Sequence, residues 1–242
     1  MRLTTQKLEL DLSPEAFGEL RRSVDIMDDG AALRERMRED GYLYLPGYLN
    51  RAAVLEARAD LLDRLAEANC LEPGTPTEAA IARKDHGSYF MPELAQDNRP
   101  LMRLLYEGRM MAFYQRLLGG EVRHFDYTWM RAVTPGSGTA PHCDIIYMGR
   151  GTTNLFTAWT SLGDIPREIG GLMILEGSHK HDRLRLNYGA RDVDTYCANH
   201  NDMRSTGNSS FGALTFNPIR LRERLGGRWL TADFRAGDLL TF

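Results

Sequence analysis

The chain has 242 residues, 43% of them hydrophobic and 26% charged, which is enough to bury the core of one domain. A net charge of -3 and a pI near 6.1, without a block of lysine or arginine, argue against nucleic-acid and membrane partners. Because residues 1–12 contain no apolar signal segment and no window reaches membrane-spanning length, we expect a cytoplasmic protein. The scattered cysteines, Cys70, Cys143 and Cys197, predict reduced thiols.

Helical spacing dominates the first 120 residues. Ser13 predicts the cap of one helix, and Asn50 predicts the cap of a second. Between them, residues 42–45 form a short strand-like segment, and residues 100–118 resume helical spacing. The apolar stripe of the second helix consists of Val54, Leu55, Leu61, Leu62 and Leu65.

A long connection over residues 70–98, punctuated by prolines, separates the helical segments. Long loops often carry function, so Lys84, His86 and Tyr89 in this connection are candidates to reach a ligand. Solvated loop residues are the simpler interpretation of the same three side chains.

Short strand-like segments follow Gly120 and are separated by glycine and proline turns. They span residues 122–133, 145–148, 156–162, 172–175, 214–216, 229–234 and 239–242. Several short strands with such punctuation indicate a sandwich or barrel. The polar stretch 199–210 is a candidate lid over an open end of that barrel.

Three His-x-Asp pairs are the candidates for chemistry. Side chains two residues apart on a strand point to the same face, so a histidine and an aspartate at this spacing can hold one metal ion. Non-heme Fe(II) oxygenases use two histidines and one carboxylate on one face of the metal. The pairs are His124 with Asp126, His142 with Asp144, and His200 with Asp202.

Sequence context favours the pair formed by His142 and Asp144. A turn over residues 135–141 delivers these side chains to the start of the apolar segment 145–147, where ligands at the mouth of a barrel belong. The pair in segment 122–133 is more simply a hydrogen-bonded strand pair. The pair in the polar stretch lacks a rigid element and is more simply solvated.

Four stretches of the chain carry a resemblance to one enzyme family. They are residues 40–49 (DGYLYLPGYL), the pair His142 and Asp144, residues 158–180 with AWTSL and GGLMILEGSHK, and residues 237–242 (GDLLTF). In this order they resemble the phytanoyl-CoA dioxygenase family of Fe(II)/2-oxoglutarate-dependent oxygenases. The resemblance covers nearly all of the chain.

The resemblance implies a mainly β fold with a helical buttress. Its core would be a double-stranded β-helix (jelly roll), with the N-terminal α-helices packed outside. The chain would form a single domain over residues 1–242, helix-rich in 1–120 and built of jelly-roll strands in 121–242. The implied cofactors are Fe(II) and 2-oxoglutarate, and the implied activity is O2-dependent hydroxylation of a small organic substrate.

The resemblance also implies roles for particular residues. His142 and Asp144 take the positions of iron ligands, and an aspartate at position 144 favours hydroxylation over halogenation. Trp129 and Trp159 take positions that line the 2-oxoglutarate pocket in the family, although strand tryptophans also simply fill cores.

Two neighbours of Trp129 are further candidates. Tyr127 and Arg131 share its strand face by the period of two, so they either meet substrate or face outward.

The distal histidine of the family, and the arginine that pairs with 2-oxoglutarate, follow the Gly-Asp turn by more residues than remain after Asp238. We therefore expect a sequence truncated before both. His179 and His181 are the alternatives for the third ligand, although the family's Gly-Ser-His-Lys segment normally ends a strand without touching metal.

Two other functions remain open on the sequence. One is a metal-binding or ligand-binding protein of the same fold without oxygenase activity. The other is an interaction protein in which one face of the barrel packs against another chain. Binding of Fe(II) together with 2-oxoglutarate distinguishes the oxygenase from the first, and a metal dependence of thermal stability distinguishes it from the second.

Overall fold

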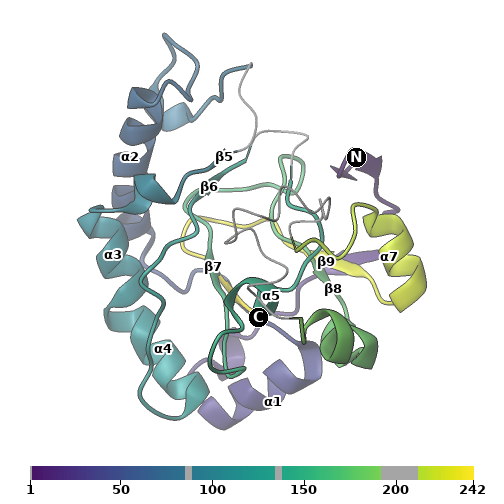
Figure 1. Cartoon of the computed structure of the whole chain (residues 1–242). Helices are drawn as coiled ribbons and strands as arrows, with labels where there is room; N and C mark the ends of the chain where they lie inside the picture. Colours follow the sequence, from purple (N-terminus) through teal and green to yellow (C-terminus); the bar gives the residue numbers. More distant parts are fainter. Residues whose placement is uncertain (1, 85–88, 134–137, 192–211) are drawn as a thin grey trace.

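The computed structural model combines a layer of helices with several small β-sheets (Figure 1). It describes residues 2–84, 89–133, 138–191 and 212–242. The predicted lid, His86, the pair His200 and Asp202, Cys197 and the side chain of Tyr89 lie outside the described residues. Within the described ranges, no helix has the length and apolar character needed to cross a membrane.

The helices and strands are short. The α-helices are α1 (Gly30–Asp40), α2 (Arg51–Glu67), α3 (Arg99–Tyr106), α4 (Gly108–Leu118), α5 (Ile145–Met148) and α7 (Pro218–Leu225). The strands are β1 (Thr4–Thr5), β2 (Leu8–Glu9), β3 (Phe17–Glu19), β4 (Leu43–Leu45), β5 (Tyr89–Phe90), β6 (Arg131–Ala132), β7 (Ala158–Thr160), β8 (Ile174–Leu175), β9 (Trp229–Thr231) and β10 (Leu239–Thr241).

Helix α2 begins where the sequence predicts. The side chain of Asn50 accepts a hydrogen bond from the backbone N–H of Ala53 at 3.0 Å, which satisfies a donor that the first helical turn leaves unpaired. Four of the five predicted stripe residues are buried, whereas Leu55 is 41% exposed and Ala57 takes a buried place instead.

The predicted helix after Ser13 is wrong. The carbonyl of Ser13 accepts hydrogen bonds from Ala16 and Phe17 in a turn that leads into β3. The first long helix is α1, capped by Asp29 and ended by Gly41, whose φ of 78° suits glycine. A Cβ at Gly41 would overlap the imidazole of His179, so glycine is also required there for space.

Two three-stranded sheets enclose the main core. One has the order β4-β10-β7 with antiparallel pairing, and the other has the order β3-β9-β8. Leu240 of β10 lies opposite Tyr44 and Trp159, and this face packs against Leu230 and Phe234 of the second sheet region. Successive residues of a strand face opposite sides, so Leu239 points the other way.

Helices cover the outer face of the first sheet. Leu239 packs with Leu45 against Leu33 of α1 and Phe113 of α4, and all four side chains are fully buried. Figure 1 shows α2, α3, α4 and α1 following one another along this side of the molecule. The predicted arrangement of N-terminal helices outside a β core is therefore present.

The β content is lower than the sequence predicts. Residues 145–148 form a helical turn rather than a strand, residues 214–216 form no strand, and the segment 122–133 is paired only at β6. Within the described residues, the two three-stranded sheets do not close into a barrel. The described residues thus form a mixture of helices and small sheets, and the mainly β prediction is wrong for these segments.

The side chain of Asp238 links the start of β10 to the segment around β4, up to 194 residues earlier in the chain. Its side chain is 3% exposed, and Oδ1 accepts a hydrogen bond from the backbone N–H of Gly47 at 2.7 Å. Oδ2 accepts from the hydroxyl of Tyr44 at 2.8 Å and from the N–H of Arg235 at 3.0 Å. These bonds hold the start of β10 against β4.

We expect Asp238→Ala to lower the free energy of unfolding by about 3 kcal/mol, because it leaves buried donors without an acceptor. Tyr44→Phe removes only one of the three bonds and should cost about 1 kcal/mol. Urea unfolding followed by circular dichroism measures both changes. Asp182→Ala, at a side chain that is 78% exposed, is the control. Equal small effects for Asp238→Ala and the control would contradict the role given to Asp238.

Candidate metal centre

The structure brings His142 and Asp144 together. Nε2 of His142 lies 3.1 Å from Oδ1 of Asp144, and the two side chains are 21% and 23% exposed. The backbone differs from the expected strand, because Asp144 has helical φ and ψ of -63° and -25° and begins the turn α5. Ile146 of this turn is fully buried against Tyr188, and this packing overrides the strand propensity of the isoleucines.

The imidazole of His142 is held from its other side. Nδ1 donates a hydrogen bond to the carbonyl of Ala140 at 2.8 Å, so Nε2 is the ring nitrogen that faces Asp144. The ring of Tyr147 packs edge-on at a centroid distance of 5.5 Å. A histidine oriented through its second nitrogen in this way is typical of metal ligands.

Thr157 holds the carboxylate of Asp144. Its hydroxyl donates to Oδ2 of Asp144, so the two carboxylate oxygens have different partners. Burial acts to raise the pKa of Asp144, but the hydrogen bonds from His142 and Thr157 together hold that pKa below its ordinary value. Asp144 is therefore ionised at neutral pH, which is the form that binds a metal.

The residue between the two candidates behaves differently. Burial raises the pKa of the Cys143 thiol to about 11, so the thiol is protonated at neutral pH. Burial acts to lower the pKa of His142, while hydrogen bonds with Asp144 and Ala140 hold it above its ordinary value. His142 and Asp144 thus form the candidate metal-ligating pair of this segment, whereas the protonated Cys143 thiol is not suited to bind a metal.

The geometry of the pair fits a divalent metal ion. Two ligands that each lie about 2.1 Å from a metal, at a right angle to one another, are about 3.0 Å apart. The observed separation of 3.1 Å between Nε2 and Oδ1 matches this value. Among the described residues, no third His, Cys, Asp or Glu joins the pair.

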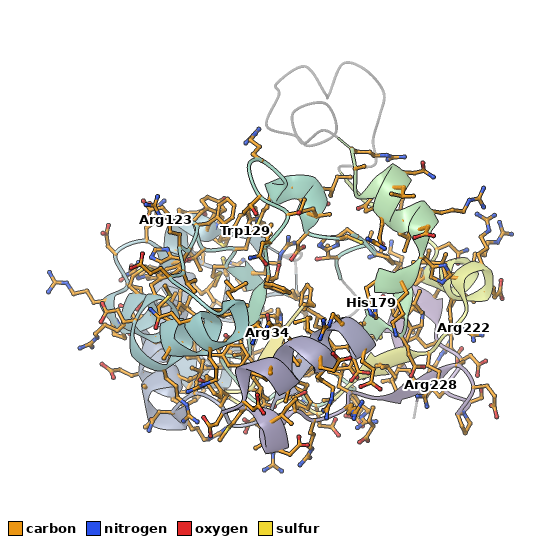
Figure 2. The ribbon with its side chains drawn as sticks, turned by 90° about the horizontal axis from the view of Figure 1, so that it is seen from below. Arg34, Arg123, Trp129, His179, Arg222 and Arg228 are labelled. Carbon is orange, nitrogen blue, oxygen red and sulfur yellow. The ribbon has the colours of Figure 1, made fainter. Side chains whose placement is uncertain are left out.

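The alternative ligands His179 and His181 are engaged elsewhere. The Nε2 atom of His179 bonds the carbonyl of Arg38 at 3.1 Å, and that of His181 bonds the carbonyl of Leu225 at 2.7 Å. Figure 2 shows His179 beside α1, in a different part of the molecule from Trp129.

The two predicted pocket tryptophans lie in different surroundings. Trp159 lies in the core between the sheets, with its ring 4.6 Å from that of Phe234, and it shares the strand face of Thr157 by the period of two. Trp129 is 40% exposed and packs edge-on against Tyr127 at 4.6 Å. Of the two, Trp159 is the one on the face that leads to Asp144.

The second His-x-Asp pair does not form a comparable arrangement. The ring of His124 packs against Tyr106 at 4.1 Å, and its Nδ1 bonds the carbonyl of Phe125 at 2.9 Å. Asp126 is exposed, as is Lys84 of the long connection.

Thr157 is the site residue that sequence reasoning missed. It lies two residues before Trp159 in a predicted strand, so alternation alone places it on the inner face. Its backbone also pairs with Phe242 through bonds of 2.9 and 3.3 Å, which ties the site to the end of β10. Figure 1 shows α5, β7 and the C-terminus together at the centre of the molecule.

Comparison with known proteins identifies the family. Residues 37–242 match the family described as Phytanoyl-CoA dioxygenase (PhyH), and the chain belongs to it. Membership of this family, predicted from the resemblance, is thereby confirmed, and with it the cofactors of the family, Fe(II) and 2-oxoglutarate.

Two curated relatives are similar in sequence. Both are named 1-deoxypentalenic acid 11-beta-hydroxylase. The protein of Streptomyces exfoliatus is 28% identical over 163 residues, covering 64% of this chain and 56% of its own length. The protein of Streptomyces arenae is 26% identical over 183 residues, covering 69% and 60%. The chain thus spans less than two thirds of the length of these relatives.

Two solved structures of the epimerase SnoN are similar in fold. One is described as the non-heme alpha ketoglutarate dependent epimerase from nogalamycin biosynthesis, with a TM-score of 0.44, 20% identity, and coverage of 88% of this chain and 72% of that one. The other is the epimerase in complex with Fe3+, alpha ketoglutarate and nogalamycin RO, with a TM-score of 0.46, 23% identity, and coverage of 88% and 74%.

We expect Thr157→Val to weaken the binding of a divalent metal by about tenfold, because Asp144 loses the donor that orients its carboxylate. Anaerobic titration with Co(II), followed by visible absorption, measures this affinity. Thr160→Val in β7, three residues further along the chain, is the matched control, because the buried Thr160 hydroxyl has no hydrogen-bond partner within the described ranges. Equal affinities of the two variants would show that Thr157 does not support the metal ligand.

Proposed function

We propose that this protein is an Fe(II)/2-oxoglutarate-dependent dioxygenase that hydroxylates a small organic substrate. His142 and Asp144 are two of its metal ligands. The observation that carries the proposal is the convergence of Nε2 and Oδ1 at 3.1 Å, each held by a second hydrogen bond, in a member of this family. The hydroxylase names of the sequence relatives support the reaction class.

The residues of the chain bind and orient. His142 and Asp144 would hold the metal ion, to which 2-oxoglutarate and O2 would also bind. Iron with 2-oxoglutarate supplies the oxidising chemistry that converts a C–H bond to an alcohol. Thr157 and the carbonyl of Ala140 fix the directions of the two ligands, so the ligands need no reorganisation when metal binds.

We also propose that the stacked sheets belong to a double-stranded β-helix. The inner faces of β4-β10-β7 and β3-β9-β8 share one apolar cluster, as the two sheets of a jelly roll do. Trp159 lies in this cluster and would bound the 2-oxoglutarate site from the core side. In the same way, a core cluster shared by α1, α4, β4 and β10 supports a single domain.

A second candidate function is a metal-binding or ligand-binding protein of the same fold without oxygenase activity. It is favoured by one observation, the set of two rather than three ligands among the described residues. The two candidates differ in whether 2-oxoglutarate binds to the metal and is consumed.

We expect Asp144→Ala to abolish the metal-to-ligand charge-transfer absorption that Fe(II) and 2-oxoglutarate produce together without oxygen. It should likewise abolish O2-dependent formation of succinate. The control is Asp126→Ala, which removes the carboxylate of another His-x-Asp pair and should leave both signals unchanged. Wild-type signals in Asp144→Ala would refute the ligand assignment. Absence of the absorption band in the wild type would favour the second candidate.

A further inference from the structure

A row of exposed aromatic side chains lies on the surface near the candidate metal centre. Phe90, Phe125, Tyr127 and Trp129 are 48%, 44%, 41% and 40% exposed. Their rings form a continuous series, with centroids 6.4 Å apart for Phe125 and Trp129, 4.6 Å for Trp129 and Tyr127, and 6.4 Å for Tyr127 and Phe90. We call these four residues the aromatic wall. Contiguous exposed apolar surface of this kind marks binding sites.

A guanidinium group stands at one end of the aromatic wall. The Cζ atom of Arg131 lies 5.2 Å from the centroid of the Phe90 ring, and Nη1 donates to Thr139 Oγ1 at 3.2 Å. Arg131 is exposed, and no carboxylate of the described residues forms an ion pair with it. A guanidinium that retains unpaired donors is suited to a carboxylate, whose two oxygens match its paired N–H groups.

Arg131 is also close to the candidate metal ligands. Thr139, its hydrogen-bond partner, precedes Ala140, whose carbonyl holds the imidazole of His142. The positive charge of Arg131 acts to lower the pKa of both His142 and Asp144, as a nearby cation must. The wall therefore ends in a cation at the edge of the metal centre.

We infer that this surface binds the organic substrate, and that the substrate is an apolar molecule with one carboxylate. The carboxylate lies on the guanidinium of Arg131, and the apolar body lies along Tyr127 and Trp129. That the bound acid is the substrate rests on the proposed function. The inference adds the chemical class of that substrate.

A carboxylate at Arg131 has two sources, the substrate and 2-oxoglutarate. The two carboxylates of 2-oxoglutarate are joined by a short chain that has no apolar body to cover the aromatic wall. The wall extends from Phe90 to Phe125, so most of its exposed surface lies beyond the reach of such a small diacid. This extent favours an apolar monocarboxylic acid as the occupant.

The test uses 1-adamantanecarboxylate and its neutral counterpart 1-adamantanecarboxamide as probes, with affinities measured by calorimetry on the metal-free full chain. We expect the wild type to bind the acid at least about tenfold more tightly than the amide. Arg131→Gln should remove this preference, and Arg131→Lys should retain part of it. Trp129→Ala should weaken both probes alike, because it removes apolar contact and no charge.

The matched control is Arg220→Gln, which removes an exposed guanidinium on α7 and should leave the preference intact. Thermal unfolding midpoints show whether each variant is folded. Absence of acid binding in the wild type, equal affinities for acid and amide, or a preference that survives in folded Arg131→Gln overturns the inference.

A second titration separates the two sources of the carboxylate. Fe(II)-loaded protein is titrated with 2-oxoglutarate, and the charge-transfer absorption is followed. If Arg131→Gln weakens 2-oxoglutarate as much as the acid, and the acid displaces 2-oxoglutarate, Arg131 serves the co-substrate and the inference is overturned. If the wild type shows no absorption band but keeps an Arg131-dependent preference for the acid, the proposed function fails and the acid-binding surface stands.

Discussion

The central strand β10 is the constraint on which the rest of the molecule depends. It pairs with β4 on one side and β7 on the other, and its residues are fully buried. Because side chains alternate across a strand, Leu240 faces the second sheet and Leu239 faces the helices. A shift of one residue would exchange these faces. The pairing of the three residues of β10 therefore determines which side chains enter the core between the sheets and which enter the core against the helices.

This register reaches the candidate metal centre through β7. Thr157 precedes β7 and pairs with Phe242, which follows β10, so its side chain is held on the inner face. Asp144 lies in a loop and a single helical turn, which are less constrained than a sheet. The hydrogen bond from the Thr157 hydroxyl fixes the orientation of this carboxylate relative to the rigid sheet. The candidate metal centre is therefore positioned by a strand that contributes neither of its two candidate ligands.

Features governed by local chemistry were predictable from the sequence, and features governed by distant packing were not. The cap at Asn50 and the strands around residues 43–45 and 239–241 follow from side-chain chemistry and alternation. The pairing of His142 with Asp144 was also predicted, although on the wrong backbone. Ile146 packs against Tyr188, 42 positions later in the chain, and no local pattern reveals that partner. The bond from Thr157 to Asp144 likewise spans a loop, so alternation indicates its face but not its acceptor.

The hydrogen bonds of two largely buried aspartates explain why Asp238 stabilises the fold whereas Asp144 is suited to binding a metal ion. Asp238 accepts three hydrogen bonds from donors with fixed positions. Two are backbone N–H groups and one is a buried tyrosine hydroxyl. Asp144 accepts one such bond from Thr157, while its other oxygen faces Nε2 of His142. The proton between that oxygen and the imidazole is the one component of the pair that a metal ion can replace, because both groups remain ligands when it departs. A carboxylate whose two oxygens are both bound to fixed donors stabilises the fold, whereas one that shares a proton with a histidine keeps a position for a cation.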